Sequence, residues 1–479
     1  MTATINDLPY ELLSQILQAA AEFNALQGPL YSYGLSQAPE PLQHAQLQRV
    51  IRGQLSPDTL RFNSTESLRQ VARRWHDWAA EYALETLYVS RWRGSERWMQ
   101  SKTLGTVHSQ PSSIAVYRDP YHSLRKTMQL FEANITLASC VRRIWFDGYY
   151  GAETNTMIFG ILNRCSNLNC LTLPWTALRY GDENDWSRLL GDDDQIRTIS
   201  SLELLAVDLK DSQMSNINNR VDKKPLNSPH VNFRGLKRLK IFGHSNFMPL
   251  MDEDLIAISH TARNLREIHI TGTASVTIKG IEALADSSAE SLEVVEHSPR
   301  AADGFAHENP TFVPKQIDHL CQKILRCPRL ESLSLTVPSL CEGLFADTSV
   351  NWYGEMQIRT MTICGRHPLF LKNSPDAQPE FWRVLDSARF LVAMREKEGV
   401  ELNIEIFVNN WIFEPRCFLV HGNFDSAVMA SRGMWLPERS HSSKGPYGQT
   451  GLYGKDDSPY ESISEEIFKD GLEKHYVHF

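Results

Sequence analysis

The chain has few of the features that mark a secreted, membrane or disulfide-stabilised protein. Its 479 residues include only eight cysteines, and no two of them form a C-x-x-C pair. This favours reduced thiols in a cytoplasmic and/or nuclear protein. The N-terminal sequence MTATINDLPYELL lacks the basic start and apolar core of a signal peptide. No apolar run approaches the length that a bilayer crossing requires, so we expect no membrane partner.

The chain also lacks an excess of positive charge. It has 49 Lys and Arg residues against 57 Asp and Glu residues, and its formal net charge is −8. Proteins that bind nucleic acid without sequence preference depend on basic residues that neutralise phosphates. The charge therefore argues against nucleic acid as a general partner, although it leaves room for a local basic patch. The length corresponds to roughly three compact domains, or to fewer if the chain is an elongated array.

No set of residues has the spacing of a catalytic or metal site. The segment 243–247 begins like a nucleophile elbow, but Phe247 stands where the sharp turn needs glycine. The glycines in 445–454 lack the Lys-Ser/Thr ending of a phosphate-binding loop, and the acidic run 192–194 is typical of a solvated loop. We expect no catalytic residue, no metal and no cofactor. A third functional hypothesis is a hydrolase that uses Ser245 or a buried cysteine, but the sequence identifies no partner residues for either nucleophile.

Two segments near the N-terminus predict amphipathic helices. Pro9 suits a first helical turn, where its missing N–H would be unpaired in any case. Apolar residues follow at helical spacing, at Leu12, Leu13, Ile16 and Leu17. A second helix is expected over 68–79, with Leu68, Val71, Ala72, Trp75 and Ala79 on one face. Taken singly, each could be an ordinary helix that packs into its own domain.

Together, these two segments resemble an F-box. The matching residues are Leu8, Pro9, Glu11, Leu12 and Ile16, followed by Val71, Arg73, Arg74 and Trp75. The resemblance implies a helical module that binds the adaptor subunit of an SCF-type, cullin-based ubiquitin ligase. The adaptor-docking residues would be Leu8, Pro9, Leu12, Leu13, Ile16, Val71 and Trp75. The sequence departs from the family in an insertion, residues 23–67, rich in glycine and proline and with a possible helix over 42–55.

A short apolar pattern then recurs along the chain, with apolar residues at the first, fourth and sixth positions. Its copies are Val141/Ile144/Phe146, Leu168/Leu171/Leu173, Leu202/Leu205/Val207, Leu236/Leu239/Ile241, Leu265/Ile268/Ile270, Leu292/Val295/His297, Leu330/Leu333/Leu335 and Ile358/Met361/Ile363. The first positions recur every 27 to 38 residues, and helical spacing fills several of the gaps. Strand alternating with helix at a nearly constant period is typical of a solenoid with a parallel sheet.

The array resembles the cysteine-containing leucine-rich repeats that accompany many F-boxes. The residues that carry this resemblance are Cys165 and Cys327, each three positions before the first leucine of a copy. Other copies have alanine at that place, at Ala262 and Ala289. The alternative is an ordinary α/β domain with leucine-rich strands.

The sequence thus predicts an α/β fold in four parts. Residues 1–90 would form the F-box-like module with its insertion at 23–67, and 91–135 a joining segment with Trp92 and Trp98. Residues 136–410 would form the repeat array, which a helix from Phe381 and a strand over 400–408 would close. Residues 411–479 would be a partly flexible extension that ends in an acidic helix.

The predicted function is substrate recognition in a cullin-based ubiquitin ligase. The module would bind the adaptor, the repeats would bind an unknown client protein through the loops after the strands, and the chain would catalyse nothing itself. The alternative is an interaction scaffold with a degenerate F-box and no role in ubiquitin transfer. The insertion at 23–67 is the motive for this alternative.

Overall fold

The computed structural model describes residues 5–27, 31–32, 40–41, 64–91, 121–191, 199–207, 209, 225–244, 250–271, 273, 276, 278–298, 326–337, 342–360, 377–408, 411–422, 441–442, 460–474 and 477. The chain divides into two compact units. The first comprises residues 1–205 and 209–231, and the second comprises residues 206–208 and 232–479. The two units are described separately.

The first unit begins with a helical module. It contains η1 (Ile5–Asp7), α1 (Tyr10–Gln27), α3 (Glu66–Arg69) and α4 (Arg73–Glu85). Its core consists of Leu13, Leu17, Ala21, Leu68, Trp78 and Ala79. The expectation of one helix over 68–79 is wrong, because Ala72 has extended backbone between α3 and α4. The break lets Leu68 and Trp78 enter one core while Val71, between the helices, stays 58% exposed.

The insertion of the helical module is only partly described. Helix α1 continues past Phe23 to Gln27, and the short strands β1 (Tyr31–Ser32) and β2 (Glu40–Pro41) pair antiparallel. The helix expected over 42–55 lies outside the described residues, as does most of the joining segment with Trp92 and Trp98.

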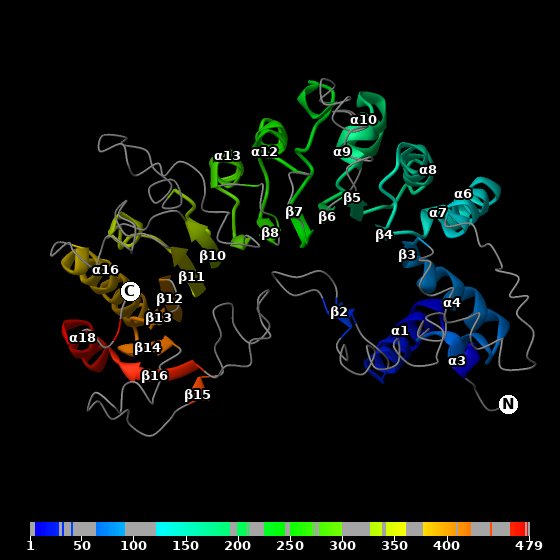
Figure 1. Ribbon diagram of the computed structural model, residues 1–479. Coiled ribbons are helices and arrows are strands. Elements are labelled where there is room, and N and C mark those ends of the chain that lie inside the picture. Colours follow the sequence, from blue (N-terminus) through cyan, green and yellow to red (C-terminus); the bar gives the residue numbers. More distant parts are fainter. Residues whose placement is uncertain are drawn as a thin grey trace, which may run out of the picture. The chain divides into compact units, whose positions relative to one another are not determined.

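A parallel sheet follows the helical module in the first unit. It consists of β3 (Thr86–Ser90), β4 (Arg143–Asp147), β5 (Cys170–Pro174) and β6 (Ser201–Val207) in that order. The helices are α6 (His122–Ala133), α7 (Ile135–Ser139), α8 (Ala152–Leu162), α9 (Ala177–Tyr180) and α10 (Glu183–Leu190), with η3 (Pro225–Asn227) after the last strand. Figure 1 shows α6, α8 and α10 on the same side of these strands.

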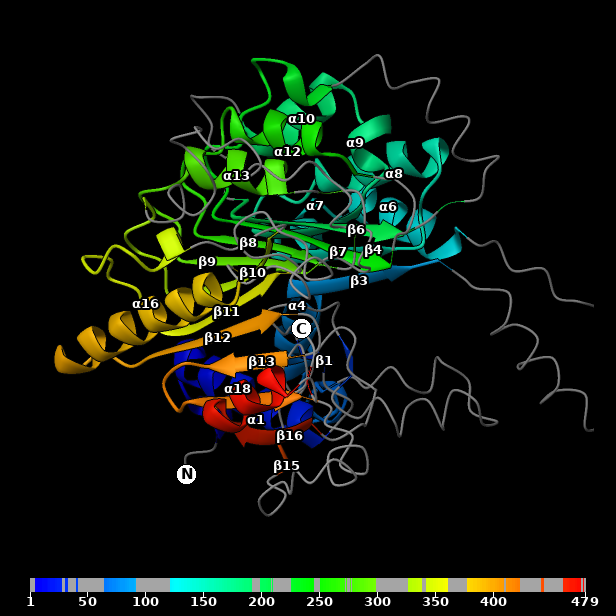
Figure 2. The same cartoon turned by 60° about the vertical axis from the view of Figure 1, so that its left-hand side comes forward.

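The second unit also contains parallel strands in sequence order. They are β7 (Arg238–His244), β8 (Glu267–Thr271), β9 (Val294–Ser298), β10 (Ser332–Val337), β11 (Gly354–Thr360) and β12 (Leu402–Val408). Its helices are α12 (Asp252–Ser259), α13 (Ile278–Ser287), α16 (Ala377–Lys397) and α18 (Glu465–Glu473), with η6 (Glu342–Leu344). Helices α12 and α13 pack side by side, on one face of β7, β8 and β9 (Figures 1 and 2).

The fold is therefore mixed helix and strand with a mostly parallel sheet, and the predicted α/β class is confirmed. The expected helices from Ile158, Leu255, Ile281 and Phe381 form α8, α12, α13 and α16. The helix expected from Ile317 lies outside the described residues. Apolar side chains at the predicted strand positions are buried. They include Ile144, Phe146, Leu171, Leu173, Leu239, Ile241, Ile268, Ile270, Leu333 and Leu335.

Two copies of the repeat pattern are out of register with the structure. Leu202 pairs with Leu171, and Leu204 instead of Leu205 takes the next buried position, beside Leu173. In the last copy, Ile358 pairs with Leu335 and therefore occupies the third apolar position instead of the first. The remainder of that copy lies outside the described residues.

The strand predicted over 400–408 does not close the array. Strand β12 pairs with β13 (Trp411–Glu414), and β13 with β14 (Leu419–Gly422). Strand β14 then pairs with β16 (Tyr460–Ser464), which pairs with β15 (His441–Ser442). All four of these pairings are antiparallel. The predicted acidic helix is present as α18, but its first residues form β16; the glycines at 445–454 lie outside the described residues.

Candidate functional site

The helical module has an apolar core and, in addition, exposed apolar residues. On α1, Leu13 and Leu17 are fully buried, while Leu12 and Ile16 are 48% and 43% exposed. Leu12 and Ile16 lie one turn apart, so both lie on the same face of the helix. The predicted single apolar face of α1 is thus divided: one part forms the core of the module, and the other part is exposed.

The other predicted docking residues also include exposed residues and residues that pack against the core. Pro9 is exposed, and Leu8 is partly exposed. Trp75 packs partly against the core, and its indole nitrogen donates a hydrogen bond of 2.9 Å to the side chain of Asn6. Arg74, from the matching motif, donates to the backbone oxygens of Asn6 and Leu8 at 3.0 Å. These bonds fix the N-terminal segment against α4, and Trp78 adds a bond of 2.9 Å to Ser14 on α1.

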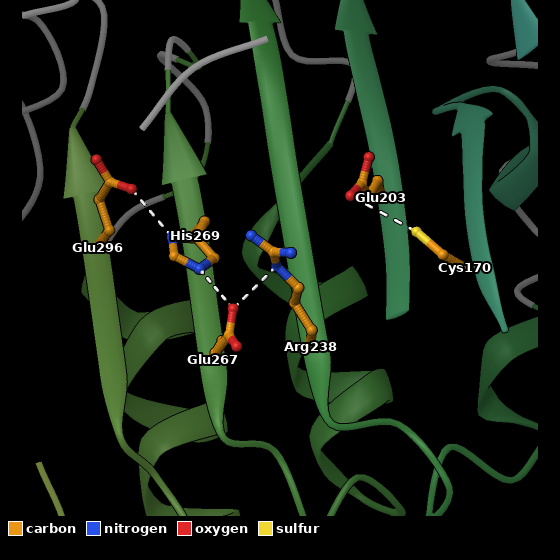
Figure 3. Close-up of polar contacts among 6 residues, drawn as sticks. All are labelled: Cys170, Glu203, Arg238, Glu267, His269 and Glu296. Carbon is orange, nitrogen blue, oxygen red and sulfur yellow. Dashed lines mark hydrogen bonds and ion pairs between the residues drawn. The ribbon is translucent and has the colours of Figure 1, made fainter. Parts of the chain in front are cut away.

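The second unit contains a charged cluster that the sequence did not reveal. Strand alternation places Ile268 and Ile270 of β8 towards the core and Glu267 and His269 on the opposite face. The parallel register brings Glu296 of β9 beside His269. The two ring nitrogens of His269 then lie 3.0 Å from Glu296 and 3.3 Å from Glu267 (Figure 3).

The geometry fixes the charge of His269. A neutral imidazole donates from one ring nitrogen only, whereas here a carboxylate oxygen faces each nitrogen. The side chain is fully buried, and burial alone would lower its pKa. Hydrogen bonds with Glu267 and Glu296, together with the negative charge of Glu296, outweigh burial and raise the pKa of His269. We therefore interpret His269 as a buried imidazolium.

Basic residues on β7 complete this cluster. Arg238 lies 3.0 Å from Glu267, and Lys240 is opposite His269 and fully buried. The hydrogen bond with His269 lowers the pKa of Glu267 against the effect of burial, and the charge of Arg238 lowers it further. In the first unit there is a smaller group, in which Thr172 donates a hydrogen bond of 2.7 Å to Glu203. Cys170 Sγ lies 3.8 Å from the same carboxylate (Figure 3). Such cross-strand pairs are units of sheet stabilisation.

This cluster predicts a pH-dependent stability that His269→Gln should remove. Because the pKa of His269 is raised in the folded protein, its stabilising contribution is complete below its ordinary pKa of 6.5 and is lost as the pH rises through the folded pKa. The contribution of Glu267, with a lowered pKa, is complete above 4.5 and is lost at lower pH. The deficit of the variant should thus be largest between pH 4.5 and 6.5 and shrink at alkaline pH. Urea unfolding of wild type and variant, within this pH range and above it, measures the stability deficit. A deficit that grew towards alkaline pH would contradict the assignment.

A second histidine in this unit contacts a serine and a glutamate. Ser462 Oγ lies 2.7 Å from His421 Nδ1, and Glu414 Oε2 lies 3.1 Å from Nε2. Acyl transfer by such a group also needs backbone N–H donors aimed at the developing oxyanion. Ser462 lies within β16, which pairs with β14 along this stretch. We interpret the group as a cross-strand polar chain.

Aromatic residues next to the repeat strands differ in burial, and several segments considered in the sequence analysis lie outside the described residues. Tyr149, Trp175 and Trp352 are buried and belong to the core, whereas Tyr353 is 42% exposed. The segments 192–194 and 445–454 and the residue Ser245 lie outside the described residues. Within the part of the chain that the structure describes, no group of three histidine, cysteine or acidic residues could hold a metal ion.

No protein-family model matches the chain, and no curated protein is significantly similar to it. Among the helices within the described ranges, none combines the length and the apolar character that crossing a bilayer would require.

Proposed function

We propose that this chain is the substrate-recognition subunit of a cullin-based ubiquitin ligase. The observation that carries the proposal is the division of α1. Leu13 and Leu17 complete the core of the helical module, while Leu12 and Ile16 of the same helix stay about half exposed. Exposed apolar anchors one turn apart are what a helix needs to bind in the hydrophobic groove of a partner. The F-box resemblance implies that this partner is the adaptor subunit.

In this proposal the chain has no catalytic step of its own. The helical module binds the adaptor, and the strand–helix array, as leucine-rich repeats, binds a client protein. Holding the client beside the ligase raises its effective concentration there, which favours transfer without new chemistry.

The proposal predicts that Leu12→Asp with Ile16→Asp abolishes adaptor binding. Two apolar hot spots replaced by charges should weaken binding by roughly 100-fold or more. The melting temperature should hardly change, because neither residue belongs to the core of the module. Isothermal titration calorimetry of the full chain with purified adaptor measures the effect.

The control for this experiment is Gln18→Asp, which adds a negative charge to the same helix. Gln18 is exposed on α1 and lies two residues after Ile16 and six after Leu12, so it does not share their face. This variant should leave adaptor binding within about twofold of wild type. Equal affinity for wild type and for the Leu12/Ile16 variant would remove the docking assignment.

The alternative is an interaction scaffold with a degenerate F-box. It is favoured by the long connection between α1, which ends at Gln27, and α3, which begins at Glu66. Wild-type protein that fails to bind the adaptor at micromolar concentration would support the scaffold. Unchanged behaviour towards serine- and cysteine-reactive probes would dispose of a hydrolase.

A further inference from the structure

The second unit contains a cavity that the proposed function does not yet use. It has a volume of about 940 Å³ and lies where β11 and β12 begin, beside the loop between β13 and β14. Its lining includes Tyr353, Arg395, Glu401, Asn403, Arg416 and Cys417. We call it the hairpin pocket. Its size is that of a small-ligand or peptide side-chain site.

Two of the four charged residues that line the hairpin pocket already have a close partner. Arg395 donates to the backbone oxygen of Trp352 at 2.9 Å and contacts Glu398. Glu414 also lines the cavity, but it is buried and lies 3.1 Å from the ring of His421.

Arg416 differs from these groups. Its nearest carboxylates are Glu396 at 3.6 Å and Glu401 at 3.7 Å, both longer than a normal N–H···O hydrogen bond. The side chains of these two glutamates are 66% and 87% exposed. They can therefore turn into solvent when another anion arrives. A guanidinium in this situation fits a carboxylate, which it can bind with two parallel hydrogen bonds.

An exposed aromatic residue follows on the same loop. Phe418 has φ of 55°, and among the described residues it is the sole non-glycine with positive φ. This conformation favours glycine, particularly in hairpin loops. Phe418 nevertheless stands there and is 57% exposed. The guanidinium of Arg389 lies 4.6 Å from its ring centre and also contacts the buried Glu465.

We propose that the hairpin pocket, together with Phe418 beside it on the loop, binds a peptide segment of the client that carries a carboxylate beside an apolar side chain. The carboxylate binds Arg416 next to Tyr353, and the apolar side chain packs on Phe418. Arginine and aromatic residues together are typical of binding hot spots, and a strained residue at a surface loop is a recurrent sign of function. The identification of the peptide as part of a client rests on the proposed function.

The test uses fluorescein-labelled, capped heptapeptide mixtures and the full chain. One set contains Glu beside Leu, and matched sets contain Gln beside Leu, Glu beside Ser, and Lys beside Leu. Fluorescence polarisation should show binding of the Glu–Leu set, with each of the others at least about tenfold weaker. Arg416→Glu should reverse the preference towards the Lys–Leu set. Arg234→Glu, which changes an exposed arginine of the same unit, should not.

A second variant separates recognition from stability. Phe418→Gly should weaken the Glu–Leu set about tenfold without lowering the melting temperature, because glycine suits the positive φ. Ile256→Ala, at another exposed apolar residue of this unit, should leave binding unchanged. Lack of binding by every set at roughly 1 mM would overturn the proposal. So would a lower melting temperature with unchanged binding for Phe418→Gly.

These results are independent of the adaptor test. The Leu12 and Ile16 variant changes the first unit, whereas Arg416 and Phe418 belong to the second. If the chain binds the peptide but not the adaptor, the pocket proposal stands and the proposed ligase role is wrong. If the chain binds the adaptor but not the peptide, the ligase role stands and the pocket proposal is wrong.

Discussion

Replacing His269 by alanine is expected to lower the free energy of unfolding by about 3–5 kcal/mol at pH 6. The imidazolium lies between Glu267 and Glu296, at 3.3 Å and 3.0 Å. Glu296 is only 4% exposed, so removal of its partner leaves a buried carboxylate without its principal cation. An unpaired buried charge costs far more than the lost contact itself. Urea unfolding followed by circular dichroism measures the change.

The control for this variant removes both members of the buried pair. The variant His269→Leu with Glu296→Leu places two apolar residues side by side, because residues 269 of β8 and 296 of β9 are paired in the parallel register. Replacing a buried ion pair by apolar residues is often nearly neutral, so this double variant should be more stable than His269→Ala. A loss below about 1 kcal/mol for His269→Ala would mean that water or a mobile partner solvates Glu296, and that the buried-imidazolium interpretation is wrong.

Replacing Trp186 by alanine should cost the first unit about 3–5 kcal/mol of folding free energy. Trp186 is fully buried on α10, and its ring meets Phe159 of α8 edge-on at 5.5 Å. A capping box between Asp182 and Asp185 fixes the start of α10. Gly181 leaves no spare room, because a Cβ there would lie 2.8 Å from the Trp186 indole nitrogen. A site packed this closely cannot collapse around the missing ring.

Hydrogen exchange of peptides from residues 152–190 would place the Trp186→Ala effect in the first unit. Trp382→Ala is the comparison, because Trp382 is partly exposed and lies in the second unit. Its loss should be less than half that of Trp186→Ala, since partly exposed side chains recover solvent contacts when truncated. Similar losses for both tryptophans would contradict the packing described for α10.

Apolar periodicity predicted most of the array but could not decide its register everywhere. The spacing of Leu236, Leu239 and Ile241 is compatible with a single buried face, and all three side chains are buried in the structure. The segment Ser201–Val207 has leucines at both parities, so the pattern alone could not choose between Leu204 and Leu205. The choice is made by pairing with Leu173 of the neighbouring strand. Register between distant strands is a tertiary property.

The charged cluster could not be predicted for the same reason. Glu267, His269 and Glu296 look like solvated positions of alternating strands, and only the parallel register of β8 and β9 brings the charges together. The helix break at Ala72 is also a tertiary effect. Alanine is the best helix former, so local propensity does not predict a break there, and the break lets both helices contribute to one core. Antiparallel strands β13 and β14 are four residues each, too short for alternation to mark them.

The change of strand direction after β12 affects whether the array can be lengthened by duplication of its units. Parallel strand–helix units present the same edge each time, so duplication of one unit lengthens such an array without altering its end. The antiparallel hairpin of β13 and β14 interrupts that repetition. Among the described residues beyond it, β15 provides the two residues His441–Ser442 as an outer strand. This described strand gives a second chain little backbone to pair with at this end of the sheet.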